Sequence, residues 1–158
     1  MNPKIVPLSQ LANDMQKIRA AGKTLVATNG CFDILHVGHV RYLAAARALG
    51  DVLLVGVNGD ASTRELKGAG RPINNENDRA EVVAALACVD LVTIFPEVRA
   101  ARFLELARPA IYVKGGDYTV DSLDQSEKSV LDGIGAAVRI IPFEKGYSTS
   151  GLLEKFAK

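Results

Sequence analysis

The chain has 158 residues, of which 48% are hydrophobic and 23% charged, a size and composition typical of one globular domain with a substantial core. Its formal net charge of +1 provides no broad basic surface, so we expect no nucleic-acid partner. No apolar run approaches the ~20 residues that span a bilayer, and the first residues lack the apolar stretch of a signal peptide. Two cysteines are too few for a disulfide framework, so we expect a cytoplasmic protein with packed thiols and no membrane contact.

Helical and strand patterns alternate through the first half of the chain. Apolar residues at positions 8, 11, 15 and 18 predict a helical extension over residues 1–22, with Ser9 as a candidate cap and Gly22 after its end. A buried strand is predicted at 24–28. A helix follows, with its apolar positions at 40, 43, 44 and 49 and its end at Gly50. The next strand is predicted at 52–57.

The second half continues the alternation after a loop at 67–75 that is rich in Gly, Pro and Asn. We expect a helix at 76–88 capped by Asn74 or Asn75, a strand at 91–95 and a helix within 97–107. Strands at 111–115 and 138–142 flank a weaker helical pattern at 121–134, and a last helix is predicted after Ser148 or Thr149.

The five strand candidates share one property, which is a run of Val, Ile and Leu without alternation. Such runs are typical of parallel strands that are covered on both faces. We therefore predict an α/β, Rossmann-like single domain over 1–158, with a mostly parallel five-stranded sheet and helices on both faces. Ligands in such folds bind at the carboxyl ends of strands, which directs attention to the loops after Thr28, Val57, Val113 and Pro142.

Residues 28–39, TNGCFDILHVGH, contain both histidines of the chain. If the helix begins near Val37, His36 and His39 are three positions apart on one face, beside N–H groups that favour an anion. Gly38 lets phosphate oxygens approach the backbone. Two alternatives stay open: solvated or capping histidines, and a zinc site that would need Cys31 or Asp33 to complete it.

The segment GCFDILHVGH resembles the G-x-F-D-x-x-H-x-G-H signature of the nucleotidyltransferase superfamily, which includes the cytidylyltransferases. Neither a Walker P-loop nor a G-x-G-x-x-G motif occurs in the chain. Residues 55–90, VKGGDYTVD and GYSTSGLLEKF extend the resemblance to the adenylyltransferases that form ADP-heptose for the lipopolysaccharide core. This similarity covers about residues 24–157 and leaves no room for the kinase half found in bifunctional members, so we expect the free-standing form.

The resemblance implies transfer of AMP from ATP to D-glycero-β-D-manno-heptose 1-phosphate, with release of pyrophosphate. The acceptor phosphate is already anionic, so it attacks the α-phosphorus in line without a general base. His36, His39 and Lys67 are the expected catalytic residues, which stabilise charge on the phosphates, and Mg²⁺ is expected with ATP. A homodimer is one assembly that this interpretation leaves open.

The resemblance also implies two sets of binding residues. The expected nucleotide-binding residues are Asn29, Gly30, Cys31, Phe32, Gly38, Lys114, Gly115, Gly116, Asp117, Tyr147, Ser148 and Thr149. The expected acceptor-binding residues are Asp33, Asp60, Arg71 and Arg79. Structural roles compete at several positions: a solvated loop cation at Lys67 or Arg71, a turn or cap at Asp33, Asp60 or 147–150, and a surface salt bridge at Arg79. Asp33 is also a candidate for holding Mg²⁺ through water.

One departure from the related enzymes bears on the nucleotide. Cytidylyltransferases of glycerol phosphate carry an arginine a few residues before the S-T-T-like segment of the superfamily, whereas this chain reads PFEKGYSTS. We therefore expect ATP to be preferred over CTP. The rival hypotheses are another substrate pair, such as CTP with glycerol 3-phosphate or ATP with phosphopantetheine, and a catalytically inactive nucleotide-binding regulator.

Overall fold

The computed structural model describes residues 2–116, 118–142 and 146–156, and its centre is one parallel sheet. The five strands are β1 (Leu25–Gly30), β2 (Val52–Asn58), β3 (Leu91–Phe95), β4 (Ile111–Gly115) and β5 (Ala137–Ile141). All neighbouring pairs are parallel and the order is β3-β2-β1-β4-β5. The predicted α/β fold with five parallel strands is confirmed. β1 is the point at which the strand order reverses, where such sheets bind ligands.

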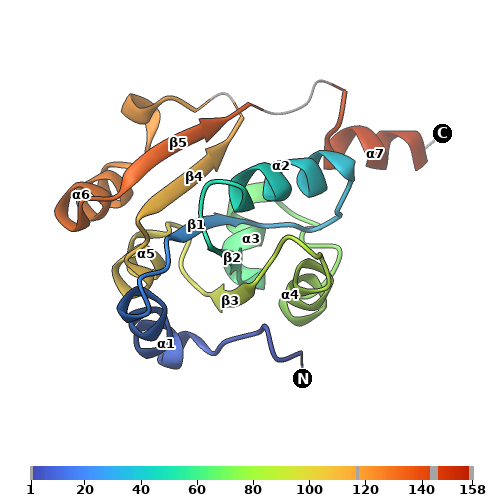
Figure 1. Ribbon diagram of the computed structural model, residues 1–158. Coiled ribbons are helices and arrows are strands. Elements are labelled where there is room, and N and C mark those ends of the chain that lie inside the picture. The colour runs from blue at the N-terminus through green and yellow to red at the C-terminus, as the bar shows by residue number, and fades with distance from the viewer. Residues whose placement is uncertain (1, 117, 143–145, 157–158) are drawn as a thin grey trace.

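Helices cover both faces of this sheet (Figure 1). They are α1 (Leu8–Ala20), α2 (Val37–Arg47), α3 (Asp60–Lys67), α4 (Glu76–Ala84), α5 (Ala101–Ala107), α6 (Gln125–Ile134) and α7 (Thr149–Phe156), with a 3₁₀ turn at Val120–Ser122. Buried side chains of α1, α5 and α6 pack on one face, and those of α2 and α4 pack on the other. None of the helices in the described part of the chain is long and apolar enough to cross a membrane.

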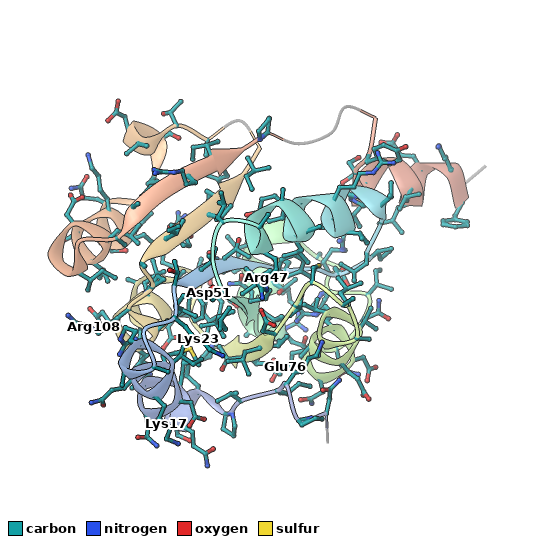
Figure 2. The ribbon with its side chains drawn as sticks, viewed as in Figure 1. Lys17, Lys23, Arg47, Asp51, Glu76 and Arg108 are labelled. Carbon is teal, nitrogen blue, oxygen red and sulfur yellow. The ribbon has the colours of Figure 1, made fainter. Side chains whose placement is uncertain are left out.

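The sheet has an apolar cluster on each face, and successive side chains of β1 enter the two clusters in turn. Leu25 and Ala27 belong to the cluster under α1, α5 and α6, whereas Val26 belongs to the cluster under α2 and α4. The period of two in a strand directs successive side chains to opposite faces, and here each face is covered. Figure 2 shows side chains filling both spaces between the sheet and the helices. Leu11 and Met15 of α1 are fully buried, so α1 is part of the core.

Helix α3 was not predicted, and Lys67 is its last residue rather than part of a flexible loop. The buried side chains of α3 are the polar Ser62 and Thr63, so the sequence carries no apolar period there. Polar atoms hold this helix in place. The backbone N–H of Asp60 donates to the carboxylate of Glu76 at 2.7 Å. Glu76 lies at the start of α4 and is labelled in Figure 2.

Helix ends and faces correct several other predictions. Asn75 caps α4, with its side chain accepting from two backbone N–H groups, but α4 ends at Ala84 rather than at position 88. Ser9 lies inside α1 and does not cap it. Of the apolar positions predicted for α2, Leu43 is fully buried as expected, but positions 40, 44 and 49 are exposed, and the buried face is completed by Tyr42 and Ala46.

Candidate active site

A cavity of about 530 Å³ lies at the carboxyl ends of β1, β2 and β4 and the N-terminal ends of α2 and α7. This volume is within the usual range for small-molecule sites. Of the expected site residues, the cavity is lined by Asn29, Gly30, Cys31, Phe32, Asp33, His36, Gly38, His39, Lys67, Arg71, Lys114, Gly115, Tyr147, Ser148 and Thr149. The sheet therefore brings together residues that are more than a hundred positions apart in the sequence.

The two histidines meet at the first turn of α2. His36 is the residue before the helix and His39 is in its first turn, and their ring centroids are 3.9 Å apart. The backbone N–H of His36 donates to Nδ1 of His39 at 3.3 Å. Because Nδ1 accepts this bond, neutral His39 carries its hydrogen on Nε2.

Both imidazoles are neutral near pH 7. Burial lowers the pKa of His39 to about 4, and the charges of His36 and Lys67 act in the same direction. Burial also lowers the pKa of His36. The pair therefore offers N–H donors to a ligand rather than fixed cations.

Gly38 lies directly against the His36 ring. A Cβ at position 38 would be 2.9 Å from both Cε1 and Nδ1 of His36, and 3.3 Å from Cβ of Tyr147. The Nδ1 atom of His36 is buried and has no hydrogen-bond partner in the described structure. Nε2 is therefore the ring nitrogen of His36 that remains for a ligand.

The N-terminus of α7 lies beside that of α2 (Figure 1). The hydroxyl of Thr149 donates to the carbonyl of Ile34 at 3.1 Å, and the Tyr147 ring is nearly parallel to the His36 ring at 6.3 Å. Ser148 caps α7, accepting the N–H of Gly151 at 3.0 Å. Free N–H groups of two helix ends therefore face the same cavity, which favours an anionic ligand.

Asp33 holds the loop that follows α3 against the histidine segment. Its carboxylate accepts from the N–H groups of Ile73 at 2.8 Å and Asn74 at 3.0 Å, and from Nε of Arg71 at 2.6 Å. Burial opposes ionisation of Asp33, but the bonds from Asn74, Ile73 and Arg71 outweigh it and lower the pKa. Asp33 therefore orients a turn and positions Arg71 at the cavity.

Arg79 is buried, with 2% of its surface exposed. Its guanidinium donates to the carbonyls of Asn74 and Cys31 and to Oδ1 of Asp60, at 2.9, 2.5 and 2.8 Å. Neither Arg79 nor Asp60 is among the described residues that line the cavity. Arg79 forms an ion pair, as one alternative expected, but its side chain is buried while that of Asp60 is 35% exposed, so it is no solvated surface pair; this Arg79 clamp joins α3, α4 and the histidine segment.

Comparison with known proteins decides the family. The family model described as cytidylyltransferase-like matches residues 27–155, which include β2 to β5, β1 from its third residue onward, and all the described residues that line the cavity. The chain belongs to the cytidylyltransferase-like family. Membership makes it a nucleotidyltransferase.

Several curated relatives of this chain share one name. The "Bifunctional protein HldE" of Geobacter sulfurreducens is 46% identical over 155 residues, which are 98% of this chain and 31% of that protein. The protein of the same name from Geotalea uraniireducens is 49% identical over 152 residues, 96% of this chain and 31% of the relative. The chain therefore spans about a third of the length of these relatives.

One solved structure agrees with this assignment, and a second is similar in fold alone. A lipopolysaccharide core biosynthesis protein from Thermoplasma volcanium is 32% identical, with a TM-score of 0.65 over 80% of this chain and 100% of that one. A pantoate-β-alanine ligase from Francisella tularensis, at 13% identity and a TM-score of 0.61 over 93% of this chain and 69% of that one, shares the fold.

The cavity of this cytidylyltransferase-like chain also contains residues that sequence reasoning missed. They are Tyr42, Asn58, Leu66, Val98, Arg99, Tyr118, Glu127 and Ser150. Asn58 directly follows Val57, so the strand-end rule contained a usable signal for it. Arg99 and Glu127 carry no local signal, because the packing of α5 and α6 brings them to the cavity. Gly116 is absent from the described lining, and Asp117 lies outside the described residues.

Metal ligands are scarce in the described part of the site. Those residues contain no group of three His, Cys, Asp or Glu side chains placed to hold a metal ion, so they provide no third ligand for a zinc bound by the histidines. Asp33 already accepts three protein donors, and Glu127 is paired with Lys114. Mg²⁺ in nucleotide sites keeps several waters and takes ligands from the substrate phosphates and only one or two carboxylates, so a site with few free carboxylates is compatible with Mg²⁺ that enters with the nucleotide.

Proposed function

We propose that this nucleotidyltransferase transfers AMP from ATP to D-glycero-β-D-manno-heptose 1-phosphate, giving ADP-heptose and pyrophosphate, in the cytoplasm. Support comes from the 46% identity to the bifunctional HldE protein and from the similarity to a lipopolysaccharide core biosynthesis protein. The observation that carries the chemistry is the neutral histidine pair beside two helix N-termini in one cavity.

The proposed reaction is a direct displacement at the α-phosphorus. An oxygen of the sugar 1-phosphate forms the new bond, and the bond to pyrophosphate breaks on the opposite side. No group has to remove a proton, because the attacking phosphate is already anionic. The protein's part is to align the two substrates and to stabilise charge on the phosphate oxygens.

Several groups of this chain are placed to contact the phosphates. Nε2–H of His39 and Nε2 of His36 are the imidazole groups available to phosphate oxygens, and the N–H groups of α2 and α7 add donors beside them. Lys67 and Arg71 line the same cavity from the end of α3 and the following loop. Mg²⁺ bound to the nucleotide would neutralise part of the phosphate charge.

The experiment is a grid of substrates. The protein is incubated with ATP or CTP and with a panel of acceptors that includes heptose 1-phosphate, mannose 1-phosphate, glycerol 3-phosphate and phosphopantetheine. Pyrophosphate release is measured and each product is identified by mass. We expect the highest kcat/KM with ATP and heptose 1-phosphate. Equal efficiency with CTP would refute the choice of nucleotide, and absence of turnover with every pair would refute catalysis.

A further inference from the structure

A buried carboxylate without a role in the proposed reaction lies at the wall of the cavity. Glu127 of α6 is 4% exposed. Its Oε1 accepts the backbone N–H of Ala100 at 2.8 Å, and its Oε2 is 3.7 Å from Nζ of Lys114. A buried carboxylate is costly unless it is paired, so Glu127 holds the Lys114 ammonium in one place.

Lys114 passes this constraint to β1. Its Nζ donates to the hydroxyl of Tyr112 at 3.2 Å and lies 5.1 Å from the centre of the Tyr118 ring. Tyr112 is fully buried, and its hydroxyl donates to Oδ1 of Asn29 at 2.6 Å. Burial, and next the charge of Glu127, raise the pKa of Tyr112, which keeps this hydroxyl protonated as a donor.

The chain of contacts determines which end of the Asn29 amide faces a ligand. Tyr112 is paired with Ala27 in the parallel register of β4 and β1, so its ring lies two residues before Asn29 on the same side of the sheet. Oδ1 of Asn29 is occupied by Tyr112. Among the described residues none accepts a hydrogen bond from Nδ2, and Asn29 lines the cavity, so its two N–H groups remain for a ligand.

Charge divides the cavity into two ends. Lys67 lies near the histidines, where its charge contributes to the low pKa of His39 and where the helix N-termini also favour anions, whereas Arg71 is paired with Asp33 at 2.6 Å. At the other end the Lys114 ammonium is balanced by Glu127, so the pair has no net charge. That end offers fixed N–H donors and a partly exposed tyrosine, Tyr118, to a neutral polar group.

We propose that the end of the cavity formed by Asn29, Lys114 and Glu127 binds the hydroxyl groups of a sugar ring, with Glu127 and Tyr112 as positioning residues. The inference rests on the proposed function, in which both substrates join a sugar ring to a phosphate. Two rings carry this chemistry, the ribose of ATP and the ring of the sugar 1-phosphate. Asn29 and Lys114 contact the hydroxyls, and Glu127 and Tyr112 act through them.

The test compares ligands that differ by one hydroxyl. Equilibrium binding is measured for ATP against 2′-deoxy-ATP and 3′-deoxy-ATP, and for β-mannose 1-phosphate against its 2-deoxy and 3-deoxy analogues. The proteins are the wild type, Glu127→Gln and Tyr112→Phe. Asp132→Asn, which removes a charge from an exposed position of the same helix, is the matched control. Melting temperatures are recorded for every variant. Pyrophosphate, which has no sugar hydroxyls, serves as the control ligand.

We expect the wild type to bind the parent ligand about tenfold more tightly than the deoxy analogue in one of the two arms, and that arm identifies the ring. Tyr112→Phe keeps the buried ring, so the protein folds, and the preference should fall to about twofold. Glu127→Gln should lower it similarly, while pyrophosphate binding to Tyr112→Phe and every property of Asp132→Asn stay within twofold.

Three results would overturn the proposal. They are a wild type without preference in either arm, a folded Tyr112→Phe protein with the full preference, and equal weakening of all ligands including pyrophosphate. Binding is measured without turnover, so an inactive wild type that still shows the preference would refute only the proposed reaction.

Discussion

Replacement of Gly38 by alanine separates the geometry of the site from the stability of the fold. The added Cβ would be 2.9 Å from Cε1 and Nδ1 of the His36 ring, whereas favourable contacts between heavy atoms begin near 3.5 Å. The ring therefore has to move by about 0.5 Å. A misplacement of about 1 Å in an active site can lower the rate about 10²-fold, so we expect kcat to fall about tenfold.

The stability of the fold should change little in Gly38→Ala, and any change should be a gain, in contrast to the loss of activity. Gly38 is in the first turn of α2 with no positive φ, and alanine is favoured over glycine in a helix by about 0.5–1 kcal/mol. The atoms that must move belong to the end of a side chain. We therefore expect the free energy of unfolding, measured by urea denaturation, to stay level or to rise by up to about 1 kcal/mol.

Gly133 provides the matched control. It is also a helical glycine, and a Cβ there would meet nothing within 4 Å. Gly133→Ala should gain the same helix stability and keep the wild-type kcat for pyrophosphate release. A Gly38→Ala protein with wild-type kcat would refute the dependence of catalysis on the position of His36. A large loss of stability would show that the ring cannot move.

Four further outcomes follow from the site. His39→Ala should lower kcat about 10²–10³-fold, as loss of one preorganised donor does, with a much smaller change in ATP affinity; near-normal kcat would contradict the proposed role. The pKa of His39 is about 4 in the folded chain and near 6.5 when unfolded, so the unfolded chain binds more protons between these values. The free energy of unfolding should therefore fall as the pH drops from about 6.5 to 4, and it should fall less steeply in His39→Gln. An NMR titration of the imidazoles that gives His39 a midpoint near 6.5 would refute this. Arg79→Met should destabilise the fold by about 3 kcal/mol in urea denaturation, because methionine cannot replace the three hydrogen bonds that the buried guanidinium donates to Asn74, Cys31 and Asp60. A change below about 1 kcal/mol would contradict this role. Lys67→Ala, at an exposed helix end, should change stability by less than about 0.5 kcal/mol yet lower kcat/KM, and unchanged kinetics would make Lys67 a solvated cation.

Local signals made most of the fold predictable. Strand β2, for example, contains the run VLLVGV and is buried along its whole length, so no partner had to be known to recognise it. Helix α3 escaped because its buried contacts are the hydroxyls of Ser62 and Thr63, which bond to backbone carbonyls. The position of helix α2 in the chain was predicted, but only part of its buried face was. The face that packs on the sheet includes Tyr42, whose hydroxyl is hydrogen-bonded to Thr28 and Val113.

Some residues of the site could likewise be predicted from the sequence, and others could not. His36, Gly38 and His39 are neighbours in the sequence, so the spacing alone predicted that they would meet. Glu127 reaches the cavity only because α6 packs beside α5, and no pattern in residues 121–134 distinguishes it from an exposed helix residue. Tertiary packing also separates Lys67 from Arg79: both are cations after β2, but one is exposed at the cavity and the other is enclosed.

The cavity takes its lining from Asn29 near the start of the chain to Ser150 near its end. Contacts over such separations carry the entropy cost of closing long loops, and folds rich in such contacts form slowly. A peptide that carries TNGCFDILHVGH would hold both imidazoles but not the end of β4 or the start of α7. Recombination between related genes would therefore preserve activity only when the segment from β1 to α7 is inherited as a unit, whereas a graft of the histidine motif alone would transfer a sequence without a site.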